Sequence, residues 1–121
     1  MKKILFVEDE PTLQKAVGEI LTQEGFRVFS ALDGEKGLEL IKKENPDLVL
    51  LDLILPKKDG FEVLKEIKEN EKLKDMPVIV LTNLEGIGDV EKALSLGATT
   101  YLIKANYELD DVVNKIKETL K

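Results

Sequence analysis

One carboxylate, Asp52, stands near the middle of the apolar run LVLLDLILP. Three more acids, Glu8, Asp9 and Glu10, directly follow another apolar run, Ile4–Val7. Carboxylates that lie close together repel one another, and Mg²⁺ is a cation that prefers oxygen ligands of this kind. A central carboxylate can also act as a nucleophile and form an aspartyl phosphate. These residue types therefore predict metal-assisted phosphoryl chemistry if the fold brings them together.

Two further polar groups complete the candidate site. Thr82 ends the apolar run that begins at Val78, and Lys104 follows the run Thr100–Ile103. An ammonium group and a hydroxyl group can both bind phosphoryl oxygens. Taken singly, each residue has an ordinary alternative: an acidic turn before a helix, a turn residue, a helix N-cap or a solvated lysine. The prediction of a phosphoryl or metal site therefore depends on their convergence.

The apolar runs that carry these residues are typical of buried strands, because they are short, rich in β-branched residues and separated by helical periodicity. The expected strands are Ile4–Val7, Val28–Ala31, Leu48–Leu51, Val78–Leu81 and Thr100–Ile103. Gly25 and Gly97 stand where helices should end in a left-handed residue. Pro46 and Pro77 come just before strands, where a helix cannot continue.

Five strands alternating with five helices predict an α/β fold of the flavodoxin-like (βα)5 type. It is a three-layer sandwich in which helices cover both faces of a parallel five-stranded sheet of order 2-1-3-4-5. Ligands of such sheets bind beyond the carboxyl ends of the strands, where the strand order reverses. Glu8, Asp9 and Asp52 should converge there. No linker or repeat interrupts the pattern, so we expect one domain over residues 1–121.

Composition narrows the chemistry further. The chain has 121 residues, a formal charge of −6, and neither histidine nor cysteine. Histidine and thiol chemistry are thereby excluded, and the negative charge disfavours direct binding to nucleic acid or to anionic membrane surfaces. No segment is long enough to span a membrane, and the first apolar run is too short for a signal peptide. We therefore expect a cytoplasmic protein.

The motifs together resemble the receiver domain of the two-component response regulator family. The resemblance covers essentially the whole chain and lies in ILFVEDEP, PDLVLLDLILPKKDGFEVL, PVIVLTN and GATTYLIKA, in this order. It implies that a sensor histidine kinase or phosphotransfer protein donates a phosphoryl group to Asp52 with the help of Mg²⁺. Such a protein phosphorylates and dephosphorylates itself and is not a turnover enzyme.

The resemblance also implies a set of metal ligands. Asp9 matches the direct Mg²⁺ ligand, and Glu8 matches the acid that acts through water. Asp52 and the backbone carbonyl of Ile54 would complete the protein's share of the metal shell.

The remaining implied roles concern a conformational switch. Thr82 matches the hydroxyl that moves to the phosphoryl group, Tyr101 the aromatic that turns inward behind it, and Lys104 the lysine that pairs with a phosphoryl oxygen. The face formed by the fourth helix, fifth strand and fifth helix would then signal to a downstream protein target. Gly60, after the acceptor strand, is expected to relax a turn before the next helix.

Two positions depart from the family's pattern. Receivers usually follow the lysine with a proline in a cis peptide bond, whereas Ala105 follows here. Because a cis bond before a non-proline residue costs about 2.5–4 kcal/mol, we expect a trans bond. Asn83 stands where the family favours a small residue. Ile54 and Leu84, which flank the expected phosphoryl position, are both apolar, and we expect them to screen it from water and prolong its lifetime.

Other classes of function remain open. The main alternative keeps the fold without phosphorylation: a pseudo-receiver, or an engineered or consensus scaffold, acting only through protein contacts. A flavin or nucleotide binder is disfavoured because the loop after the first strand is acidic and lacks a glycine fingerprint. A haloacid-dehalogenase-type phosphatase would need an Asp-x-Asp pattern, but Leu53 and Ile54 follow Asp52. The sequence leaves open whether the receiver stands alone or was cut from a longer protein.

Overall fold

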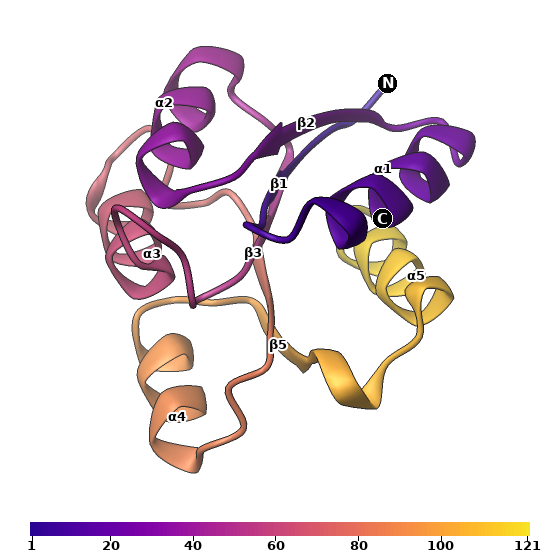
Figure 1. The fold of residues 1–121 in the computed structure, drawn as a ribbon. Coiled ribbons are helices and arrows are strands. Elements are labelled where there is room, and N and C mark those ends of the chain that lie inside the picture. The colour runs from indigo at the N-terminus through magenta and orange to yellow at the C-terminus, as the bar shows by residue number, and fades with distance from the viewer.

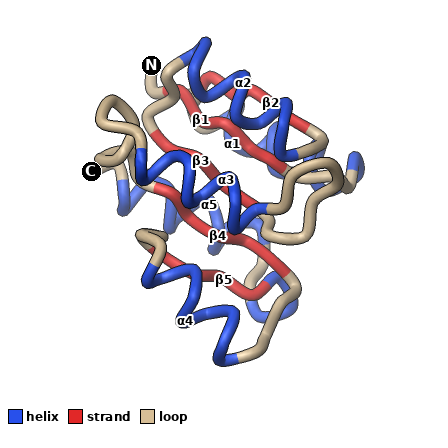
Figure 2. The backbone as a smooth tube through the Cα atoms, turned by 90° about the vertical axis from the view of Figure 1, so that its left-hand side faces the viewer, coloured by secondary structure: helices blue, strands red, loops and turns tan.

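A computed structural model describes all 121 residues. Five parallel strands form one sheet in the order β2-β1-β3-β4-β5, which confirms the predicted topology (Figure 2). The strands are β1 (Lys3–Val7), β2 (Arg27–Ala31), β3 (Leu48–Leu51), β4 (Val78–Thr82) and β5 (Thr100–Ile103). The helices are α1 (Pro11–Gln23), α2 (Gly34–Glu44), α3 (Gly60–Glu69), α4 (Ile87–Ser95) and α5 (Leu109–Thr119), with a short 3-10 helix, η1 (Lys104–Asn106).

Helices cover the sheet on both faces, as the three-layer prediction requires. Helices α1 and α5 lie on one face and helices α2, α3 and α4 on the other (Figure 1). Each face has its own apolar core, because the side chains of a strand alternate between the two faces. All four residues of β3 are buried, which explains why the central strand is continuously apolar.

Three strands extend one residue beyond the predicted apolar runs. Lys3 pairs with Arg27 at the start of β1 and β2, and Thr82 pairs with Ile103 at the end of β4. Backbone pairing does not require an apolar side chain, so the ladder continues into polar positions.

The helix ends follow the expected punctuation, with additions. Gly25 and Gly97 adopt φ values of 95° and 108°, which confirms the predicted left-handed positions. Asn45 ends α2 in the same region, with φ 48°. Asp33 and Asp59 cap the N-termini of α2 and α3 by accepting backbone N–H groups three residues later. No helix in the fold combines the length and the apolar character that a membrane crossing needs.

Candidate metal and phosphoryl site

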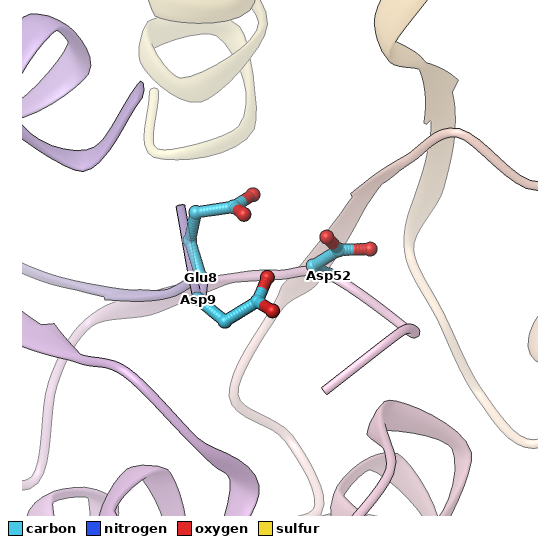
Figure 3. Close-up of side chains that lie close together, drawn as sticks. All are labelled: Glu8, Asp9 and Asp52. Carbon is cyan, nitrogen blue, oxygen red and sulfur yellow. The ribbon is translucent and has the colours of Figure 1, made fainter. Parts of the chain in front are cut away.

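The strand register brings two acids side by side at the carboxyl edge of the sheet. Val7 of β1 pairs with Leu51 of β3, so Glu8 and Asp52 follow at the same level. The backbone N–H of Asp52 donates to the carbonyl of Val7 at 3.0 Å. Carboxylate oxygens of Glu8, Asp9 and Asp52 lie within 4.8 Å of one another and face the same space (Figure 3). The structure thus brings together the three acids that the sequence placed at the switch point.

The three carboxylates differ in exposure to water. Glu8 is fully buried and Asp52 is only 3% exposed, whereas Asp9 is exposed. Two buried carboxylates require a compensating charge. Lys104 supplies it: its Nζ lies 2.7 Å from Oε1 of Glu8 and 3.0 Å from Oδ2 of Asp52. The contact to Glu8 is an ion pair without hydrogen-bond alignment, so that Oε1 accepts no hydrogen bond in the structure.

Electrostatics within this cluster shift two pKa values. Burial raises the pKa of Glu8, the nearby Asp52 raises it further, and Lys104 and the Glu10 N–H only partly offset this. Burial alone would lower the pKa of Lys104, but its contacts with both carboxylates outweigh burial and raise it. Lys104 therefore stays charged, and the cluster holds more negative than positive charge.

The loop after β3 shapes the surroundings of Asp52. The backbone N–H of Ile54 donates to Oδ1 of Asp52 at 3.2 Å, and the Ile54 side chain is 53% exposed. The metal contact expected for the Ile54 carbonyl stays a prediction.

The structure shows a different reason for a glycine at position 60 from the turn that the sequence led us to expect. A Cβ there would lie 2.3 Å from the carbonyl oxygen of Asp52, so only glycine permits the helix to start this close.

Thr82 and Tyr101 both contact the loop between β4 and α4. Thr82 is fully buried, and its Oγ1 accepts a long hydrogen bond, 3.5 Å, from the N–H of Leu84. It does not cap α4, whose N-cap is Gly86. Tyr101 is half-buried, and its hydroxyl donates to the carbonyl of Leu84 at 2.9 Å. Leu84 is thereby hydrogen-bonded to both residues to which the family resemblance gives a switch role.

Lys104 ends the strand and begins the 3-10 helix η1. The chain contains no cis peptide bond, so the Lys104–Ala105 bond is trans, as expected. Ala105 and Asn83 are both exposed. Lys104 reaches the buried carboxylates from this trans loop, and the departure at Ala105 leaves its two ion pairs intact.

Some residues near the site were not found from the sequence. Gln14 of α1 donates to the backbone carbonyl of Glu8 at 3.0 Å. It lies one turn before the buried Val17, so a polar residue in line with an apolar face was the available signal. Lys57 adopts φ 67° and lies 3.8 Å from Asp33, which links the loops after β2 and β3. No local sequence signal marks a lysine for that conformation.

The donor set suits a hard divalent cation. It consists of carboxylate oxygens, it has one exposed member through which an ion can enter, and it includes a buried oxygen without a hydrogen-bond donor. The fold and site together define an α/β domain with a buried aspartate, an acidic metal cluster and a lysine at the carboxyl edge of its sheet.

Comparison with known proteins identifies the family. The response regulator receiver domain family matches residues 4–117, and the chain belongs to this family of two-component systems. The chain is 36% identical to the DNA-binding dual master transcriptional regulator RpaA of Synechocystis sp.. The match covers all 121 residues of this chain and 50% of that protein. It is 33% identical to sporulation initiation phosphotransferase F of Bacillus subtilis, over 98% of the chain and 94% of that protein.

A solved structure agrees with these relatives. The Mn²⁺-bound form of response regulator Rcp1 is 37% identical, with a TM-score of 0.84 over 98% of this chain and 91% of that one. The chain spans about half the length of several curated relatives that are named as transcriptional regulators. Because one is named as DNA-binding, the expectation of no nucleic-acid contact can apply only to the matched receiver portion.

Proposed function

We propose that this chain accepts a phosphoryl group on Asp52 from a phosphohistidine of a sensor histidine kinase or phosphotransfer protein, with Mg²⁺ as its cofactor. The observation that carries the proposal is the position of Lys104, whose Nζ lies within 3.0 Å of Asp52 and 2.7 Å of Glu8. If Asp52 only formed a structural ion pair with Lys104, the two further acids beside it, Glu8 and Asp9, would add repulsion without a benefit. Membership of the receiver family supports the same chemistry.

The transfer is a displacement at phosphorus. A carboxylate oxygen of Asp52 forms the new O–P bond while the N–P bond of the phosphohistidine breaks, and the electron pair returns to the imidazole nitrogen. Burial keeps water from Asp52, which is 3% exposed. Lys104 remains beside the carboxylate, where its charge stabilises negative charge on the phosphoryl oxygens.

The acidic cluster would hold the metal ion. Asp9, Asp52 and the carbonyl of Ile54 are the proposed direct ligands, and Glu8 would act through water. When bound, Mg²⁺ would neutralise charge between the carboxylates and the phosphoryl oxygens. Exposed Asp9 is placed to meet the ion first, because the other two acids are buried.

The output of the domain follows from the loop after β4. In the proposal, the Thr82 hydroxyl leaves its 3.5 Å contact with Leu84 and bonds a phosphoryl oxygen. The loop then moves, and Tyr101 gives up the hydrogen bond that its hydroxyl donates to the Leu84 carbonyl in this structure and turns inward. This would reshape the face of α4, β5 and α5 for a downstream protein target. In the longer relatives named as transcriptional regulators, such a target could be a linked domain.

The direct test is phosphorylation by a small donor. The full chain is incubated with Mg²⁺ and acetyl phosphate, and intact mass spectrometry counts the added phosphoryl groups. We expect one group, dependent on Mg²⁺ and lost in Asp52→Asn. Asp75→Asn is the matched control, because Asp75 is exposed and its side chain makes no hydrogen bond.

Two outcomes would contradict the proposal. A phosphoryl group retained by Asp52→Asn would place the acceptor elsewhere. No phosphoryl group in the unchanged chain, together with no metal binding, would favour a pseudo-receiver or scaffold that acts only through protein contacts.

A further inference from the structure

The side chain of Gln14 joins helix α1 to the ends of β1 and β2. Its Nε2 lies 2.7 Å from the carbonyl oxygen of Ala31, 3.0 Å from that of Glu8 and 3.3 Å from that of Phe6. A primary amide has two N–H groups, so two of these contacts are full hydrogen bonds. The two shortest contacts go to Ala31 and Glu8.

The carbonyl of Glu8 depends on Gln14 more than the others do. The Ala31 carbonyl also accepts the backbone N–H of Glu8 at 2.9 Å. For the Glu8 carbonyl, the amide of Gln14 is the only donor that the structure shows. Glu8 is fully buried, and a buried carbonyl that loses its partner is costly. Gln14 therefore fixes the orientation of the peptide that joins Glu8 to Asp9.

We propose that Gln14 is a positioning residue for the metal site. By holding the Glu8–Asp9 peptide, it keeps both carboxylates directed toward Asp52. The inference rests on the proposed function, because it requires that these carboxylates bind a divalent ion. Groups that orient metal ligands from outside the coordination shell commonly change metal affinity by about 10–100-fold when they are removed.

The surroundings of Gln14 allow a clean substitution. Gln14 is half-buried and lines an open groove between α1 and β2. Gln23 lines the same groove from the same helix, but its side chain is exposed and makes no hydrogen bond. Gln23→Met therefore reproduces the loss of an amide from this groove without touching the Glu8 carbonyl.

The experiment measures Mn²⁺ affinity and stability in the full chain. Calorimetric titration with Mn²⁺ gives the Kd, and thermal unfolding in a chelator gives the metal-free Tm. We expect Gln14→Met to weaken Mn²⁺ binding about tenfold, and Gln23→Met to leave the Kd within twofold of the unchanged chain. Gln14→Glu should also weaken binding, although it adds a negative charge near the cluster, because a carboxylate cannot donate to the Glu8 carbonyl.

Each result decides a different point. A lower Tm with an unchanged Kd for Gln14→Met would show a merely structural role and overturn the inference. Tighter Mn²⁺ binding by Gln14→Glu would mean that charge, and not orientation, controls affinity, and would overturn it too. If the unchanged chain and Gln23→Met fail to bind Mn²⁺, the proposed metal site itself fails, and the role of Gln14 fails with it.

Discussion

Removing the ammonium group of Lys104 should destabilise the fold in the absence of metal. Lys104→Met keeps most of the side-chain volume but leaves the carboxylates of Glu8 and Asp52 without their shared cation. Removing one partner of a buried ion pair costs about 3–5 kcal/mol. Because the Lys104 side chain is 14% exposed, we take the lower end, about 3 kcal/mol.

The assay is urea unfolding followed by circular dichroism, at neutral pH and in a chelator. Lys65→Met is the matched control, because Lys65 is exposed on α3 and makes no ion pair or side-chain hydrogen bond. Its effect on the free energy of unfolding should stay within about 0.5 kcal/mol, as for other surface substitutions. The difference between the two variants isolates the charge of Lys104 from the loss of a lysine in general.

The pH dependence gives the same reasoning a second test. Burial, with Asp52 beside it, raises the pKa of Glu8 above the ordinary 4.5. A carboxyl with a raised folded-state pKa favours the fold when protonated, and that stability is lost as pH rises through the folded-state pKa. Lys104 lowers the pKa of Glu8, so without Lys104 that pKa rises further and more stability is lost at neutral pH. The difference in free energy of unfolding between Lys104→Met and the unchanged chain should therefore narrow as the pH falls from neutral toward 4.5.

Two results would refute the reasoning about Lys104. If Lys104→Met lowered the free energy of unfolding by less than about 1 kcal/mol at neutral pH, the ion pairs of Lys104 would contribute no more than ion pairs on an exposed surface. A gap that stays constant with pH would mean that the lost stability comes from packing and not from unpaired carboxylates.

Three further predictions concern residues around the site. Gly60→Ala should lower the free energy of unfolding by about 1–3 kcal/mol, since its Cβ must displace the backbone of Asp52 and Leu53, just after β3; an unchanged urea midpoint would contradict this. Burial, together with nearby carboxylates, raises the pKa of Tyr101 above its ordinary value of 10.0. The chain has two tyrosines, so a Tyr107→Phe variant leaves Tyr101 as the only phenol, and its ionisation, followed by ultraviolet absorbance, should occur above pH 10.0. The protein should lose stability as the pH rises through that value, because the folded state favours the neutral phenol. Ionisation of the Tyr101 phenol at or below pH 10.0 would contradict the prediction that burial raises its pKa. Finally, Ile54→Asn and Leu84→Glu should shorten the half-life of the phosphorylated protein, and an unchanged half-life would show that these side chains do not screen water.

The sequence was most informative about what the sheet decides. The apolar runs predict the strands, and parallel strands deliver their following residues to one edge, so the approach of Glu8, Asp9 and Asp52 could be predicted. The reach of Lys104 to both buried acids could not, because it depends on the conformation of η1. A strand pattern does not determine the path of the loop that follows.

Residues that act through the backbone were the hardest to predict. Gly60 is visible in the sequence, but its cause is the close approach of the Asp52 carbonyl and not a turn. Gln14 stands out in the sequence as a polar residue in line with an apolar face, but its partners are backbone carbonyls, which have no sequence signature of their own. Such roles need the three-dimensional path of a neighbouring segment, which local patterns of polarity do not contain.

The hydrogen bonds of Leu84 explain how a small chemical change could alter a distant face. Its N–H makes a long contact of 3.5 Å with Thr82, while its carbonyl accepts a shorter one of 2.9 Å from Tyr101. In the proposed switch, the hydroxyl of Thr82 gives up the weaker contact to bond a charged phosphoryl oxygen, a stronger type of hydrogen bond. The opposing cost is the contact with Tyr101, about 0.5–1.5 kcal/mol for a typical hydrogen bond. A free-energy difference of this size shifts a two-state equilibrium only several-fold, so the two positions of the loop would be close in free energy. A partner that binds one of these positions could then complete the change.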